Sequence, residues 1–235
     1  MNSNGDLVTS PEDLWPMDEF KSTAPLKIDL VYATASHPEN LFEVALYRAD
    51  ARLWLHRELA EVVIKAARIC YQKSGYIVVL KDGLRPVDVQ AAMYDAPIVK
   101  ANPHWTAGET RMLAEPGQGG HPRGMAIDMA LETADGCLVD MGTHFDHLPN
   151  DPADNPASRN YEKISNVAKS NRRLLTQAML DAASALNRQL LPLPSEWWDF
   201  RFPAAYSERY AALCEHHLLP HQRMSVKRVE HEKSR

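Results

Sequence analysis

Cysteine is scarce in this sequence, and no stretch of it is both long and apolar. The three cysteines, Cys70, Cys137 and Cys214, are far apart and form no C-x-x-C pair. This argues against a disulfide framework and fits a reducing compartment. No apolar run approaches the roughly 20 residues needed to span a bilayer, and the N-terminus lacks the basic and apolar regions of a secretory signal. We therefore expect a cytoplasmic protein.

Neither sign of charge is in large excess. The 26 basic and 31 acidic residues give a formal net charge of −5, so nucleic acid and anionic membranes are not expected as partners. A chain of 235 residues is long enough to bury one sizeable core. We expect an irregular lead-in over residues 1–25, a single domain over 26–222 and a charged C-terminal tail over 223–235. The sequence leaves the oligomeric state open.

Hydrophobic periodicity predicts a mixture of helices and strands. Apolar residues three and four apart favour two long helices, over about 41–72 and 161–190. Short apolar runs favour strands over 76–80, 125–131 and 196–200, with 137–141 as a hairpin partner of the second. Shorter helices are expected at 87–94 and 204–217, and a long loop at 96–120. The predicted class is α+β, with helices packed around a small, mostly antiparallel sheet.

The segment from His121 to Asp128 is the strongest local signal. A histidine leaving a glycine-rich loop is followed, seven positions on, by an aspartate in a predicted strand. Imidazole nitrogen and carboxylate oxygen are both good zinc ligands, and Gly124 permits the turn that would let them face one metal. The alternative is a surface loop that ends in an aspartate at a strand edge.

Two further segments place charged residues beside apolar ones. Glu196 and Asp199 flank two tryptophans, and carboxylates in such a setting are rarely buried without a partner or a metal. Arg85 follows Asp82 just after a predicted strand. This pair is either a structural ion pair or a source of fixed positive charge for an oxyanion or a substrate carboxylate.

Six ordered motifs together resemble the VanX-type D-alanyl-D-alanine dipeptidases, zinc D,D-peptidases that share their fold with hedgehog signalling domains. The similarity runs from about Leu30 to Tyr206. The motifs are Tyr32-Ala33-Thr34, Asp82-Gly83-Leu84-Arg85-Pro86, His121 to Asp128 (H-x-x-G-x-A-x-D), Met141-Gly142-Thr143-His144-Phe145-Asp146, Asn171-Arg172-Arg173 and Glu196-Trp197-Trp198.

The resemblance implies a role for each matched residue. His121 and Asp128 would bind one zinc ion per chain, and Glu196 would be the general base. Arg85 would stabilise the oxyanion. Asp82, Asp146 and Tyr32 would hold the ends of a small dipeptide substrate, or brace the groups that do.

The sequence departs from the family at its third zinc ligand, where Asp199 stands in place of histidine. Three interpretations follow. Asp199 replaces the ligand, a histidine of the 144–147 loop completes the site, or the catalytic centre is weakened. A second carboxylate would also make the site less positive. Gly119-Gly120 is a lesser departure, because the family often has a serine near there.

Three functions therefore remain in view. The first is zinc-dependent hydrolysis of D-alanyl-D-alanine, with His121, Asp128 and Asp199 on the metal and Glu196 as base. The second is a non-catalytic protein that binds D-amino acids or peptidoglycan peptides. The third is a D,D-carboxypeptidase that acts on longer stem peptides.

Overall fold

A five-stranded sheet forms the centre of the protein. The computed structural model describes residues 7–108 and 111–226. The strand order is β2-β4-β5-β7-β6. The bounds are Leu26–Ile28 (β2), Ile77–Asp82 (β4), Ala126–Glu132 (β5), Asp199–Arg201 (β7) and Leu191–Pro192 (β6). β2 pairs with β4 in parallel, and the other neighbouring pairs are antiparallel. A separate two-stranded sheet joins β1 (Leu14–Pro16) to β3 (Trp54–His56).

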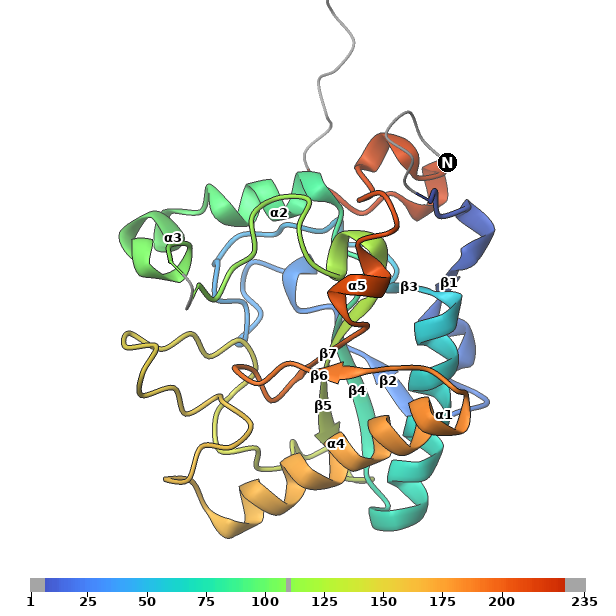
Figure 1. The fold of residues 1–235 in the computed structure, drawn as a ribbon, viewed down its shortest axis with the longest axis vertical. Coiled ribbons are helices and arrows are strands. Elements are labelled where there is room, and N and C mark those ends of the chain that lie inside the picture. The colour runs from blue at the N-terminus through green and yellow to red at the C-terminus, as the bar shows by residue number, and fades with distance from the viewer. Residues whose placement is uncertain (1–6, 109–110, 227–235) are drawn as a thin grey trace, which may run out of the picture.

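Helices cover this sheet from different sides. The two long helices, α1 (Arg57–Ser74) and α4 (Asn166–Ala185), pack against each other, and α1 also packs on β4. The shorter α2 (Val87–Tyr94) and α3 (Pro97–Ala101) lie far from α4, across the molecule (Figure 1). α5 (Ala204–Ser207) follows β7. The predicted α+β class, with a small and mostly antiparallel sheet, is confirmed.

The first long helix begins later than its sequence pattern suggests. The predicted helix covered 41–72, but α1 begins at Arg57, after the ring of His56 accepts a hydrogen bond from the Glu58 amide. Upstream, the amides of Leu46 and Tyr47 both donate to the carbonyl of Tyr32. That segment therefore finds its backbone partners in another part of the chain, which periodicity alone does not reveal.

Several other boundaries also differ from the prediction. The helix expected over 161–190 is α4, which starts where the Ser165 side chain caps the Ala168 amide. The hairpin partner expected at 137–141 is no strand, since only one bridge, from Glu132 to Leu138, forms there. The helix expected over 204–217 is only α5 and a 3-10 turn at Glu215–His217, and the 96–120 loop contains α3.

Both ends of the described chain are more ordered than expected. The lead-in predicted over 1–25 contributes β1, and the side chains of Leu14 and Met17 join the core. In the tail predicted over 223–235, Met224 is buried and Ser225 bridges to Tyr47. Apolar side chains in these polar segments are what hold them down. The remainder of the tail, 227–235, lies outside the described residues.

Three aspartates stand side by side across three strands of the sheet. In the strand register Asp82 pairs with Asp128, and Asp128 pairs with Asp199, with a bulge between Leu80 and Asp82. All three side chains are buried. Like charges directly opposite each other destabilise a sheet, so this row needs cations close by.

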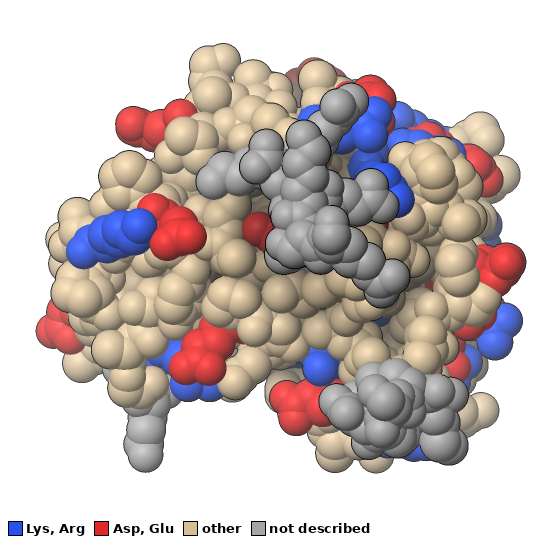
Figure 2. All heavy atoms as spheres, turned by 90° about the horizontal axis from the view of Figure 1, so that it is seen from above, with Lys and Arg blue, Asp and Glu red and all other residues tan. Residues whose placement is uncertain are grey.

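The surface carries both signs of charge. Lysine and arginine side chains are interspersed with aspartates and glutamates over the face drawn in Figure 2. Exposed large apolar side chains are scattered along the chain, as in most proteins. No helix of the described segments is long and apolar enough to cross a membrane.

Candidate active site

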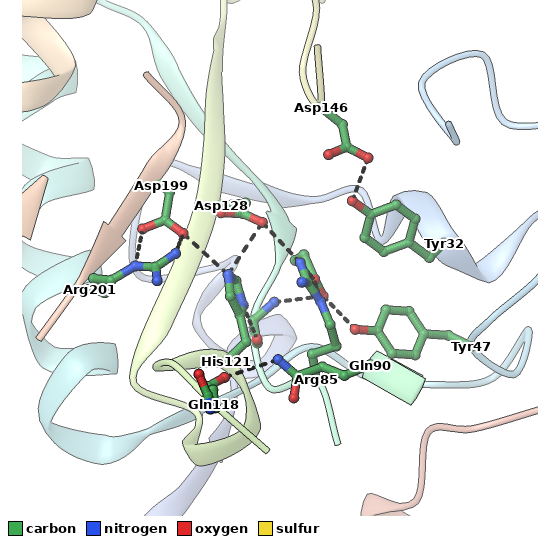
Figure 3. Close-up of polar contacts among 12 residues, drawn as sticks. Tyr32, Tyr47, Arg85, Gln90, Gln118, His121, Asp128, Asp146, Asp199 and Arg201 are labelled. Carbon is green, nitrogen blue, oxygen red and sulfur yellow. Dashed lines mark hydrogen bonds and ion pairs between the residues drawn. The ribbon is translucent and has the colours of Figure 1, made fainter. Parts of the chain in front are cut away.

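A pocket of about 350 Å³ lies over the row of aspartates. Of the site residues predicted from the sequence, only Asp82 does not line this pocket. The residues that do are Tyr32, Arg85, His121, Asp128, Asp146, Glu196 and Asp199. They come from the ends of β4, β5 and β7 and from the loops around them (Figure 3). Folding therefore gathers residues more than 160 positions apart at one cavity.

His121 presents one ring nitrogen to the aspartates. Its Nδ1 lies 2.8 Å from the carbonyl oxygen of Gly83, which can only accept, so Nδ1 carries the proton and donates. Nε2 then faces Asp199 and Asp128, and it can bind a metal once it has lost its proton (Figure 3). Gly124 adopts φ +64°, so the turn expected of this glycine is present.

The distances among these three side chains suit a metal better than direct hydrogen bonds. Nε2 of His121 is 3.4 Å from Oδ2 of Asp199 and 3.6 Å from Oδ2 of Asp128. Charge-assisted N–H···O bonds measure about 2.7–2.9 Å. Donors about 2.0–2.1 Å from a tetrahedral zinc ion lie about 3.3 Å apart. The distances from Nε2 to the two aspartate oxygens therefore match the edge of such a tetrahedron.

One carboxylate oxygen of Asp128 has no hydrogen-bond partner among the described residues. Its Oδ1 is buried and has no hydrogen bond, while Oδ2 has only the long contact to His121 and one of 3.4 Å to Arg85. Burial raises the pKa of this carboxyl group. A buried acceptor with no donor costs roughly 1–3 kcal/mol, and a bound cation would remove that cost.

Asp199 is held by two arginines that the sequence analysis did not single out. Arg201 donates from Nε to Oδ1 at 2.7 Å and from Nη2 to Oδ2. Arg159 donates to the backbone carbonyl of Asp199. Burial alone would raise the pKa of Asp199, but the charges and hydrogen bonds of Arg201 and His121 together outweigh it and lower that pKa. Arg201 was detectable in principle, because residues i and i+2 of a strand share a face.

Asp82 serves Arg85 rather than the pocket. Its Oδ1 accepts from the Tyr47 hydroxyl at 2.6 Å and from the Gly83 amide at 3.0 Å, and its Oδ2 accepts from Nε of Arg85 at 2.7 Å. Asp82, His121 and Asp128 also form a compact group of possible ligands. Both oxygens of Asp82 accept hydrogen bonds from protein groups, as both oxygens of Asp199 do from Arg201, but Asp82 does not line the pocket and Asp199 does.

Arg85 brings a fixed positive charge to the pocket wall. Besides the pair with Asp82, its Nη2 lies 3.4 Å from Oδ2 of Asp128, and its guanidinium lies 5.8 Å from the centre of the Tyr32 ring. The Arg85 amide donates to the carbonyl of His121. The two loops that carry Arg85 and His121 are thus tied by this backbone hydrogen bond and by the hydrogen bond from the His121 ring to the Gly83 carbonyl.

Glu196 stands at the pocket just before β7. The strand predicted over 196–200 starts only at Asp199, since residues 197–198 form a turn, so Glu196 lies in the loop that leads into the strand. Burial, followed by the negative charge of Asp199, raises the pKa of Glu196 to about 8. A carboxylate of raised pKa facing a pocket suits proton transfer near neutral pH.

Tyr32 and Asp146 form the opposite wall. The Tyr32 hydroxyl donates to Oδ2 of Asp146 at 2.9 Å (Figure 3). Burial raises the pKa of Asp146 to about 6. Asp146 also has φ +59°, a backbone conformation that is costly outside glycine and often found at functional sites.

Two other parts of the matched motifs have structural positions. Arg172 donates to the carbonyls of Met141, Ser158 and Pro156, so it anchors the loop that carries Asp146. His144 and His147 pack ring against ring, and neither lines the pocket. The structure therefore gives no support to a histidine of that loop as the third ligand.

The raised pKa values predict how the metal-free protein responds to pH. Burial and Arg85 lower the pKa of His121, but Asp128 and Asp199 outweigh them and raise it from 6.5 to about 9. The folded state thus keeps a proton that the unfolded chain releases. This stabilisation is complete below pH 6.5 and is lost as the pH rises to about 9. Glu196 acts in the same direction between pH 4.5 and about 8.

We therefore expect the free energy of unfolding of the chelator-treated protein to fall between pH 6 and pH 9. Urea denaturation at the two pH values measures it. Zinc should reverse the trend, since it binds better where His121 loses its proton. Equal or greater stability of the metal-free protein at pH 9 would contradict the proton uptake expected of His121 and Glu196.

Comparisons with known proteins identify the family of the chain. The sequence profile of a family described as D-Ala-D-Ala dipeptidase matches residues 13–217. The chain is 31% identical over 183 residues to the D-alanyl-D-alanine dipeptidase of Escherichia coli (strain K12), covering 77% of this chain and 81% of that protein. Among solved structures it is similar to the Serratia marcescens L-Ala D-Glu endopeptidase ChiX, with 14% identity, a TM-score of 0.34, and 64% of this chain and 82% of that chain covered.

A buried cluster of histidine and aspartates in a small pocket, combined with a peptidase profile over most of the chain, defines a metallopeptidase. The chain belongs to the D-Ala-D-Ala dipeptidase family of peptidases. The resemblance inferred from the ordered motifs is thereby confirmed.

Proposed function

We propose that this enzyme is a zinc-dependent D,D-dipeptidase that hydrolyses D-alanyl-D-alanine to D-alanine. His121, Asp128 and Asp199 would hold one zinc ion. The observations that carry the proposal are the distances from Nε2 of His121 to Oδ2 of Asp199 and to Oδ2 of Asp128, 3.4 and 3.6 Å, and the buried Oδ1 of Asp128, which has no hydrogen-bond partner among the described residues. The substrate follows from the relative in Escherichia coli, a D-alanyl-D-alanine dipeptidase.

Glu196 is the proposed general base. Zinc at this site would polarise the scissile carbonyl and acidify the attacking water. Glu196 would accept the proton of that water and deliver it to the leaving amine. Its position at the pocket and its pKa of about 8 in the metal-free protein support this exchange, because a carboxyl group of that pKa can both take and return a proton near neutrality.

Arg85 is the proposed oxyanion partner. It lines the pocket beside Asp128, and Asp82 holds its guanidinium through Nε and Nη2. A donor held in place before the reaction does not have to reorganise as negative charge develops on the carbonyl oxygen. Asp82 is thus a brace for Arg85, one of the two roles left open by the sequence.

Asp146 and Tyr32 are proposed to bind the ammonium end of the dipeptide. Asp146 is an acid at the pocket wall, and the Tyr32 hydroxyl fixes the direction of its carboxylate. A small pocket with a cation acceptor at one end would favour a free dipeptide over a longer chain. We place the enzyme in the cytoplasm, acting in cell-wall precursor turnover, D-alanine scavenging or glycopeptide tolerance.

Metal content and product release test the proposal. The purified enzyme should bind one zinc per chain and release D-alanine from D-alanyl-D-alanine, whereas chelation should abolish the release. A pentapeptide ending in D-alanyl-D-alanine should be a poor substrate. Preference for the pentapeptide would make the enzyme a D,D-carboxypeptidase. Dipeptide binding without turnover, with either Zn²⁺ or Mn²⁺, would make it a binding protein.

A further inference from the structure

We propose that Arg201 is a positioning residue of the metal centre. It leaves Asp199 one oxygen with which to bind the metal, and its positive charge offsets the negative charge of that carboxylate. This inference rests on the proposed function and concerns a residue that no motif pointed to. It explains how an aspartate can stand at the third ligand position without weakening the electrophilic character of the site.

The contact between Arg201 and Asp199 uses both oxygens of the carboxylate. Nε donates to Oδ1 at 2.7 Å and Nη2 donates to Oδ2, the parallel arrangement that arginine and carboxylate favour. Oδ1 therefore faces Arg201, while Oδ2 also faces Nε2 of His121 at 3.4 Å. Only Oδ2 is placed to serve a metal beside His121.

The backbone of Asp199 is fixed from another side. Arg159 donates to its carbonyl oxygen, and the Arg159 guanidinium lies 4.2 Å from the centre of the adjacent Phe200 ring. Asp199 is fully buried and pairs with Asp128 in the sheet register. The carboxylate is thus held in one orientation before any ligand arrives, as a preorganised first ligand shell requires.

The three aspartates and two arginines of the buried cluster have a net charge of −1. Arg85 offsets Asp82, and Arg201 offsets Asp199. Asp128 shares Arg85, at 3.4 Å, with Asp82 and has no arginine of its own among the described residues, and its Oδ1 has no hydrogen-bond partner there. With neutral His121, a divalent ion would therefore leave the centre at +1. Without Arg201 the sum would be zero, and such a centre would polarise its ligands less.

Arg201 lies at the pocket, where its charge can act on a bound metal, and an ion pair that only stabilised the fold would not need that position. Arg201 lines the pocket, with its Nη1 at the wall formed by Gly119, 3.7 Å from where a Cβ of that residue would stand. Its charge is therefore felt within the cavity. It follows that histidine at position 199 would be a poor ligand here, because it would leave Arg201 buried, unpaired and close to the metal.

Zinc affinity in a set of variants, measured by competition with a chromophoric chelator, tests this. Asp199→His should weaken zinc binding by about 10–100-fold, because the unpaired positive charge of Arg201 would repel the ion. Adding Arg201→Met should restore the affinity to within about threefold of the parent. Adding Arg201→Lys should not, because lysine keeps the charge.

A second pair keeps the test valid if Asp199→His fails to fold. With Asp199 in place, Arg201→Met should bind zinc about tenfold more tightly than Arg201→Lys. Both variants lose the two parallel hydrogen bonds to Asp199, but only lysine keeps a positive charge that repels the metal. Equal affinities in this pair, or an Asp199→His enzyme that binds zinc as well as the parent, would overturn the role of Arg201. Failure of the parent itself to bind zinc would instead overturn the proposed function.

Discussion

Glu196→Gln is expected to lower kcat for D-alanyl-D-alanine by about 10³-fold while zinc affinity changes less than tenfold. Glutamine keeps the size and hydrogen-bonding reach of the side chain but cannot accept the proton of the attacking water. General acid–base groups typically contribute 10²–10⁴-fold. The assay is D-alanine release with saturating zinc, alongside a zinc titration of the same protein.

The control for this variant is Glu208→Gln, which changes another glutamate of the pocket. Glu208 is exposed and follows α5, and no catalytic role is proposed for it. Its substitution should leave kcat within about twofold. If Glu196→Gln keeps more than a tenth of the parent activity, Glu196 is not the base and another pocket acid must take that role.

Asp128→Asn is expected to abolish useful zinc binding, with a loss well beyond the 10–100-fold typical of residues that only support a ligand. The metal-free variant should be as stable as the parent or more stable, because a buried carboxylate with one unsatisfied oxygen is removed. Turnover should be undetectable. The two effects together separate a metal ligand from a residue needed only for folding.

Thermal unfolding with and without zinc measures this. Zinc at about 1,000 times its Kd should raise the stability of the parent by about 4 kcal/mol, or a Tm shift of about 10 °C for a chain of this size. Asp128→Asn should show no shift, whereas Asp181→Asn, which changes an exposed acid of α4, should behave as the parent. A normal zinc shift in Asp128→Asn would remove Asp128 from the ligand set.

The sequence alone was sufficient for the class of fold, the family and most pocket residues. Short-range chemistry explains this success. Gly124 had to permit a turn, and a histidine and an aspartate on either side of it suit a metal, so His121 and Asp128 were found from spacing. The family motifs supplied the rest of the predicted set, and folding brings all of it except Asp82 to the pocket wall.

Only the tertiary structure decided the partners of these groups. Asp82 accepts a hydrogen bond from Tyr47, and the backbone of Asp199 accepts one from Arg159, and neither of these long-range contacts follows from periodicity. The late start of α1 has the same origin, since residues 41–53 find their hydrogen bonds elsewhere in the chain. Periodicity reports which face of an element is apolar, whereas the charge and coordination of a buried site depend on which distant side chains meet there.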